Sequence, residues 1–182
     1  MKTITVQASA SGMKKLQKEL IKYRNSVNSR AEIFVKRLAE VGISVGKANC
    51  GEYKNAIAFT KTFYADSQGH TIAYVIADDK FPIVREWMYH GDVKQVEISP
   101  LYMAEFGSGW YAKPLLTPPS GNGGQGTFPG QKHAWDENGW TWTTPDGEEH
   151  HSFGEQPTYP VYNAFIEMKQ RVMEIAKEVF DD

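Results

Sequence analysis

The sequence predicts an α+β fold, with an antiparallel sheet of about four strands packed by an N-terminal helical segment and a long C-terminal helix. Apolar residues recur at spacings of three and four near both ends of the chain, which is typical of helices with one buried face. The middle of the chain is rich in β-branched and aromatic residues between turn-forming clusters, which indicates hairpins. A length of 182 residues favours one domain, 1–182, with residues 107–155 as an extended loop and hairpin insertion.

The N-terminal helical segment is predicted to begin at Ser9 or Ser11, because a serine side chain can cap a helix. A second segment can restart at Asn28 or Ser29, and we expect it to stop near residues 49–51. The apolar positions that mark these segments are Met13, Leu16, Leu20, Tyr23, Val27, Ala31, Phe34, Val35, Leu38, Val41 and Val45.

Two other features of the first fifty residues shape the prediction. Gly42 and Gly46 are expected to weaken the end of the helix, since glycine is a poor helix former. Residues 2–8 alternate as a short strand or arm would, and residues 1–16 contain no apolar region of the kind found in secretory signals.

The strands are predicted as two hairpins in the middle of the chain. Residues 57–65 and 71–77 flank a cluster of turn formers, and together they indicate a β-hairpin. Residues 83–89 and 93–98 add a second hairpin, in which charged residues blur the alternation. These four segments make up the expected four-stranded sheet.

The second half of the chain is predicted to be a short helix, a loop, a hairpin and a long helix. Ser99-Pro100 suits a helix start and Gly107 suits the position just past its end. Residues 107–130 hold seven glycines and four prolines, which predicts a long loop. Residues 139–153 indicate a hairpin around Pro-Asp-Gly, and residues 160–180 carry the clearest helical periodicity. The apolar face of that last helix comprises Val161, Phe165, Met168, Val172, Ile175 and Val179.

Charge is distributed unevenly between the two parts of the chain. Residues 1–54 carry 11 Lys and Arg against 4 Asp and Glu, whereas residues 55–182 carry 9 against 18. The net charge of −2 argues against a uniformly basic nucleic-acid binder. Oppositely charged halves can steer a partner or dock one copy against the next in a ring, although they can equally be solvated surfaces. Cys50 is the one cysteine, which excludes an internal disulfide, and no apolar run is long enough to span a membrane.

No pattern in the sequence predicts a catalytic site or a cofactor. A metal site could draw on residues near the Trp-rich hairpin, but adjacent histidines on a strand point to opposite faces, so we expect no bound metal. Ser108 lacks the spacing of a nucleophile elbow, Cys50 has no histidine near it, and the glycine-dense residues 121–126 lack the rest of a phosphate loop. The metal candidates that we considered are His133, Asp136, Glu137, His150 and His151.

The tryptophans of this hairpin leave two interpretations open. Trp135, Trp140 and Trp142, with Tyr159 nearby, could form an aromatic platform for a sugar. They could also be the apolar side of a hairpin that packs on its own body or on a neighbour, which we favour. A metal- or glycan-binding enzyme built on this hairpin is therefore kept as an alternative.

Two segments resemble a family of phage tail components named after the tenth gene product of phage HK-ninety-seven. Residues 99–109 resemble the family's signature around Glu-Phe-Gly, and Glu105-Phe106-Gly107 stands intact. Here Ala104 departs from the usual spacing, and Ser108 replaces the commoner threonine. Residues 139–164 are similar to a second pattern that runs from Gly-Trp to the start of the last helix. Its matching positions are Gly139, Trp140, Trp142, Gly147, His150, Gly154, Pro157, Pro160, Tyr162, Asn163 and Ala164.

The resemblance implies a structural role rather than an enzymatic one. It implies a small α+β subunit of the virion neck or tail, made in the host bacterial cytoplasm, that forms a ring, possibly a hexamer. Its partners would be tail-tube or terminator subunits and head-connector subunits, with DNA passing through the lumen without specific binding. A tail terminator or another minor tail protein is the alternative.

The resemblance also implies which residues form the fold signature or interfaces. In that interpretation Phe106 is buried by the short helix, Gly107 reverses the chain, and Glu105 holds a nearby backbone N–H group or basic side chain. Trp140, Trp142 and Tyr162 are the remaining candidates.

Overall fold

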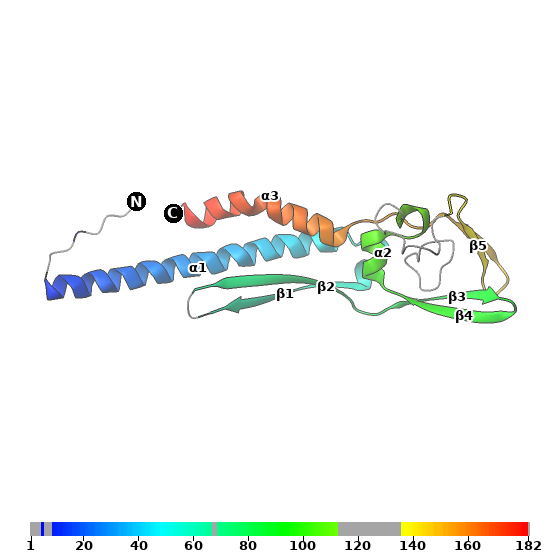
Figure 1. Cartoon of the computed structure of the whole chain (residues 1–182), viewed down its shortest axis with the longest axis horizontal. Helices are drawn as coiled ribbons and strands as arrows, with labels where there is room; N and C mark the ends of the chain where they lie inside the picture. Colours follow the sequence, from blue (N-terminus) through cyan, green and yellow to red (C-terminus); the bar gives the residue numbers. More distant parts are fainter. Residues whose placement is uncertain (1–4, 6–8, 67–68, 113–135, 182) are drawn as a thin grey trace, which may run out of the picture.

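The computed structural model describes residues 5, 9–66, 69–112 and 136–181. Within these ranges, only the backbone is described for Trp87 and Tyr89. The fold is α+β, as the sequence predicts, and the molecule is elongated (Figure 1). The helices are α1 (Ala10–Ala48), α2 (Pro100–Phe106) and α3 (Pro160–Phe180), with short 3₁₀ helices at Gly51–Asn55 and Gly109–Ala112. The strands are β1 (Ile57–Ala65), β2 (Thr71–Asp79), β3 (Ile83–Tyr89), β4 (Asp92–Ile98), β5 (Trp140–Thr143) and β6 (Glu149–Ser152).

The N-terminal helical segment is a single helix of 39 residues rather than two. The Ser9 side chain caps it by accepting a hydrogen bond from the N–H of Gly12 at 3.1 Å, and the helix passes through residues 28 and 29 without a break. The helix continues through Gly42 and Gly46 and ends at Ala48, close to the predicted stop at residues 49–51. Both glycines are buried contact points, because Gly42 faces Met168 of α3 and Gly46 faces the ring of Phe59 in β1.

The predicted four-stranded sheet is wrong, because within the described part of the chain the strands form three separate antiparallel pairs, β1–β2, β3–β4 and β5–β6. The hairpins themselves lie where the sequence places them. Polar groups at the end of β2 bond segments other than β3. Asp79 accepts a hydrogen bond from the N–H of Leu101 at 2.7 Å, and the N–H of Lys80 bonds the carbonyl of Ala56 at 2.7 Å. Pro82 then offers no N–H group, so β3 begins a new hairpin.

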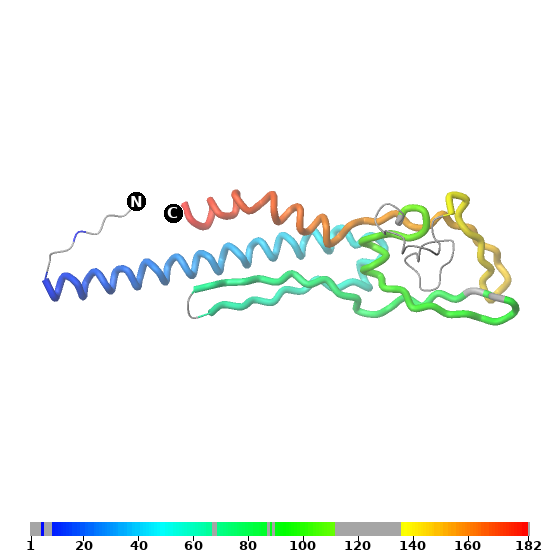
Figure 2. Tube along the Cα trace, in the orientation of Figure 1, coloured from blue at the N-terminus to red at the C-terminus, as the bar shows by residue number. Residues whose placement is uncertain are grey.

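The helices and the first hairpin form layers along the long axis of the molecule. Figure 1 shows α3 on one side of α1 and the β1–β2 hairpin on another, and Figure 2 shows the same path as a tube. The rings of Phe34 and Phe180 lie 6.1 Å apart where α3 ends, and Arg37 pairs with Glu178 at 2.7 Å. The first half of α1 extends past both the end of α3 and the β1–β2 turn.

The apolar core is small and lies where the C-terminal end of α1 meets β1, β4 and α2. Its buried residues are Cys50, Tyr53, Ile57, Phe59, Ile98, Met103 and Ala104. The predicted buried face of α3 is partly wrong. Ile175 and Val179 are buried, but Val161 and Phe165 are exposed because α1 covers the side of α3 that carries Ala164 and Met168.

Two predicted segments lie wholly or mostly outside the described residues. These are the arm at residues 2–8, of which only Thr5 is described, and the glycine- and proline-rich loop from residue 113 onward. The beginning of that loop, Gly109–Ala112, is a short 3₁₀ helix.

Candidate functional site: the junction of α2 and α3

The junction begins with α2, which carries its own start and stop signals. The Ser99 side chain accepts a hydrogen bond from the N–H of Tyr102 at 3.0 Å, and Pro100 occupies the first turn, where a missing N–H costs nothing. Gly107 ends the helix with a φ of 69°, and its N–H bonds the carbonyl of Met103 at 2.8 Å. Residues 99–107 therefore form the predicted helix, and its end points toward the start of α3.

Glu105 of α2 caps the N-terminus of α3. Its two carboxylate oxygens accept hydrogen bonds from the N–H groups of Val161 at 2.8 Å and Tyr162 at 3.1 Å. The helix has no cap of its own, since Tyr159 at the N-cap position is left-handed and makes no side-chain cap. Pro160 has no N–H group, so Glu105 binds both donors that the first turn of α3 leaves open. A negative charge at this end also interacts favourably with the helix dipole.

The segment after α2 pairs with the segment before α3 through their backbones. The N–H of Ser108 bonds the carbonyl of Glu155 at 2.9 Å, and the N–H of Trp110 bonds the carbonyl of Phe153 at 3.0 Å. In return the buried hydroxyl of Ser108 accepts a hydrogen bond from the N–H of Glu155 at 3.0 Å. The carbonyl of Ala104 accepts from the N–H groups of residues 158 and 159. The two segments that carry the family resemblance thus form one continuous junction.

Glycine is required where these two segments cross. Gly107 has a φ of 69°, and a Cβ there would lie 2.4 Å from the carbonyl oxygen of Glu155. Gly154 has a φ of 103°, and a Cβ there would lie 2.1 Å from the carbonyl oxygen of Ser108. Both positions combine a left-handed backbone with a close approach, which no other residue type accommodates without movement.

A half-buried carboxyl group lies at the edge of the junction. The hydroxyl of Tyr53 donates a hydrogen bond to Glu155. Burial raises the pKa of Glu155 above its ordinary value and the nearby Glu52 adds to this, although the Tyr53 hydroxyl acts in the opposite direction. Burial and the Glu155 carboxylate likewise raise the pKa of Tyr53. The pair therefore favours a Tyr53 that keeps its proton at physiological pH.

The other predicted signature residues lie around this junction, but not all as expected. Phe106 is only half-buried, because its ring packs on the exposed Tyr102 with centroids 4.6 Å apart. Trp140 packs over Gly109, and Trp142 stacks on His150 at 5.3 Å. Tyr162 gives its N–H to Glu105, but its side chain is exposed. Both tryptophans are half-buried, as a packed hairpin face requires.

Several residues considered as metal-binding or catalytic candidates have structural partners within the described part of the chain. No group of three or more His, Cys, Asp or Glu side chains in the described part of the chain could hold a metal ion, and His133 lies outside that part. His150 stacks on Trp142, whereas His151 bonds Thr141 on the exposed face. Ser108 uses its hydroxyl to accept a backbone hydrogen bond, and burial raises the pKa of Cys50.

Sequence reasoning missed Tyr53 and Glu155, and it considered Ser108 as a nucleophile and as a signature residue but not as a backbone acceptor. A glutamate followed by Gln-Pro gives no sign that it will be buried beside a tyrosine a hundred residues away. The available signal was Gly154, because an isolated glycine before a loop suggests that another backbone approaches closely.

Comparison with known proteins identified no relative: no family model, no curated protein and no solved structure matches this chain. None of the described helices has the length and apolar character needed to cross a membrane.

Proposed function

We propose that this chain is a structural subunit of a phage virion, a neck or tail-completion protein that forms a ring and joins the tail to the head connector. The observation that carries the proposal is the α2–α3 junction. The Glu-Phe-Gly segment and the Gly-Trp to Tyr162 segment, which resemble the phage family, meet through Glu105 and the Ser108–Glu155 pairing. Their residues are used to hold two helices together, which is a structural task.

The surface of the chain supports a role in assembly. Among the described residues, 22 large hydrophobic side chains are exposed, whereas 12 hydrophobic residues are buried. The β1–β2 hairpin illustrates this. Tyr64 and Ile72 face each other across it and, like Tyr74 and Ile76, remain exposed on the side away from α1. Exposed apolar surface on this scale is typical of subunits that pack against neighbours.

The three separate hairpins give the same support. In a two-stranded sheet, each strand leaves one row of backbone groups unpaired by its own sheet. In an assembled ring, neighbouring copies could cover these edges. The proposal needs no cofactor and no bond-making chemistry.

The test is to delete the gene from the phage or prophage that carries it and to image the particles. We expect full heads and tails that are unjoined, or tails left unfinished, and complementation with the wild-type chain should restore joined particles. Tails of abnormal length would favour a tail terminator instead. Normal joined particles would overturn the proposal. Labelled antibody against the chain should bind at the neck of wild-type particles.

A further inference from the structure

We propose that the free half of α1 docks against the acidic end of a second copy of this chain. We call residues 10–27 the basic arm and residues 136–155, which include the β5–β6 hairpin, the acidic end. The proposal rests on the assembly role proposed above, and it names the two surfaces that meet. Each copy would contribute its basic arm to one neighbour and its acidic end to the other.

The basic arm is a helix without a partner in the described part of the chain. Its exposed apolar side chains include Met13, Leu20, Tyr23 and Val27, and Tyr23 is 68% exposed. The first links from α1 to the rest of the molecule come after the arm, where Asn28 lies beside Gly69 and Arg30 donates to the carbonyl of Phe180 at 3.3 Å. Helices in proteins gain most of their stability from packing, so an arm of this length is expected to be covered in the working protein.

The charges of the two surfaces indicate that the arm binds a second copy of the chain. The basic arm carries five Lys and Arg residues against one Glu, and Lys14, Lys15, Lys18 and Lys22 form no ion pair among the described residues. The acidic end carries six Asp and Glu residues and no Lys or Arg. Five of those six acids are exposed: Asp136, Glu137, Asp146, Glu148 and Glu149. Surfaces of opposite sign attract, and they exclude the alternative pairings of arm with arm or end with end.

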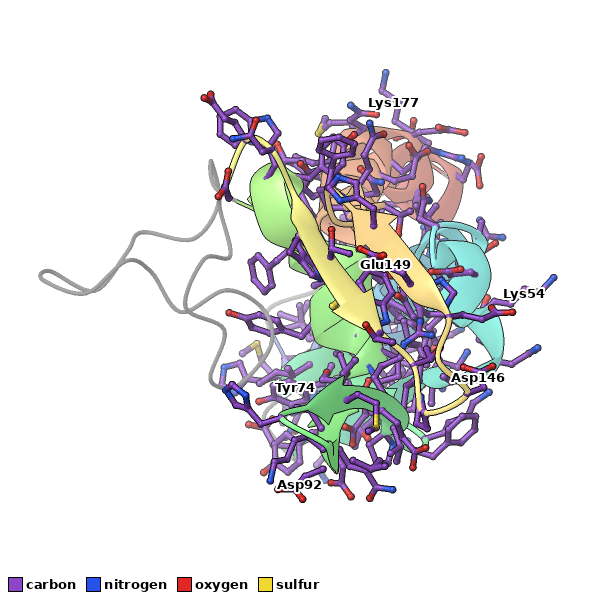
Figure 3. All side chains as sticks on the ribbon, turned by 90° about the vertical axis from the view of Figure 1, so that its right-hand side faces the viewer. Lys54, Tyr74, Asp92, Asp146, Glu149 and Lys177 are labelled. Atoms are coloured by element: carbon purple, nitrogen blue, oxygen red, sulfur yellow. The ribbon has the colours of Figure 1, made fainter. Side chains whose placement is uncertain are left out.

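The acidic end also offers apolar surface for the arm. Phe153 is half exposed, and it lies beside Trp110, whose N–H bonds its carbonyl. Aromatic side chains of this kind are enriched at the centres of protein interfaces. Figure 3 looks onto this end of the molecule, with β5 and β6 in front, Glu149 on β6 and Asp146 at the turn between the two strands. A nucleic-acid backbone would match the lysines of the arm but not its apolar side chains, which is why we favour a second copy.

Geometry makes the contact intermolecular. The arm and the acidic end lie at opposite ends of the long axis in Figure 1, and α1 alone is about 58 Å long at 1.5 Å per residue. A chain therefore cannot cover its basic arm with its own acidic end. A contact between two different surfaces repeats from copy to copy, and it closes into a ring when the rotation allows.

The experiment is a charge swap in the full-length chain, with oligomeric state measured by analytical ultracentrifugation. The first variant reverses the net charge of the arm (Lys14→Glu, Lys18→Glu, Lys22→Glu), and the second reverses that of the end (Glu137→Lys, Asp146→Lys, Glu148→Lys, Glu149→Lys). All seven side chains are exposed, so both variants should fold, which circular dichroism checks. A matched control reverses three exposed lysines elsewhere (Lys54→Glu, Lys169→Glu, Lys177→Glu).

We expect the wild type and the control to assemble alike, and each swapped variant alone to associate on the order of tenfold more weakly or worse. An equal mixture of the two variants should assemble again, because each mismatched surface then finds its complement. Variants that assemble as tightly as the wild type, or a mixture that fails to assemble, would overturn this contact. Neither result would overturn the proposal that the chain forms a ring. Loss of binding to duplex DNA in the arm variant, with unchanged assembly, would also overturn it.

A wild-type chain that stays monomeric at every concentration would overturn the contact. It would also count against the proposed ring, which the particle experiment tests separately. The two failures can therefore be told apart: assembly that ignores the swaps removes only the arm contact, whereas normal particles without the gene remove the proposed function.

Discussion

Gly46 of α1 lies directly against the ring of Phe59 in β1: a Cβ atom on Gly46 would fall 2.3 Å from Cε1 of that ring. The contact sets how closely the long helix approaches the first hairpin, and both residues are buried. One turn earlier, Gly42 approaches Met168 of α3 in the same way, with 2.6 Å from a Cβ to the sulfur. The helix is thus held on two sides through positions that have no side chain.

Gly46→Ala should destabilise the protein even though alanine is the better helix former. The rigid ring of Phe59 cannot yield without moving β1, so we expect a loss of about 1–3 kcal/mol in the free energy of unfolding. Gly42→Ala should cost less, because the flexible Met168 side chain can change rotamer. Urea unfolding of both variants measures the difference. Equal losses, or a gain at Gly46, would contradict the contact described here.

Removing the Glu105 cap should loosen the start of α3. Glu105→Ala leaves the N–H groups of Val161 and Tyr162 without their acceptor, and we expect a loss of about 1–2 kcal/mol in unfolding free energy. Glu105→Gln keeps an acceptor oxygen but loses the charge, so its loss should be smaller. Hydrogen exchange at Val161 and Tyr162 should quicken in both. Glu97→Ala, an exposed control outside the acidic end, should change stability by less than about 0.5 kcal/mol.

Gly154→Ala should be far more damaging than Gly147→Ala. Both glycines have a positive φ, 103° and 89°, so each substitution carries a backbone cost of about 1 kcal/mol. A Cβ on Gly147 meets nothing within 4 Å, whereas one on Gly154 collides with the carbonyl oxygen of Ser108. The difference between the two melting temperatures therefore reports the close approach alone. Similar melting temperatures would mean that the two segments do not cross as described.

The Glu155 carboxyl group should make stability depend on pH. Its pKa in the folded state is raised above the ordinary 4.5, so the folded protein holds that proton more tightly than the unfolded chain does. Its contribution to the free energy of unfolding is therefore full at low pH and is lost as pH rises through the interval above 4.5. In Glu155→Gln this loss is absent, so the variant should gain stability relative to the wild type as pH rises.

Urea unfolding from about pH 4 to pH 8 measures that difference. Tyr53→Phe serves as the companion variant, because it removes the hydrogen bond that favours the ionised carboxylate and should steepen the wild-type trend. A difference between wild type and Glu155→Gln that stays flat with pH would show that Glu155 titrates normally.

Local patterns in the sequence predict most of the elements. The period of three and four residues places α3 at residues 160–180, and Ser99-Pro100 with Gly107 delimits α2, because capping and backbone preferences act within a few residues. Turn formers likewise locate the three hairpins. The Glu-Phe-Gly motif points to Glu105 and predicts a backbone N–H group or a basic side chain as its partner. The structure shows two backbone N–H groups bound to it.

What the sequence could not determine was which surfaces meet. Whether four strands join in one sheet depends on long-range contacts, such as the hydrogen bond from the Leu101 N–H to Asp79. That Gly42 and Gly46 serve as contact points within α1 depends on Met168 and Phe59, which are distant in the sequence. The pairing of Tyr53 with Glu155 joins residues 102 positions apart. Segment type follows from neighbours along the chain, but packing and burial follow from neighbours in space, and those are known only once the chain has folded.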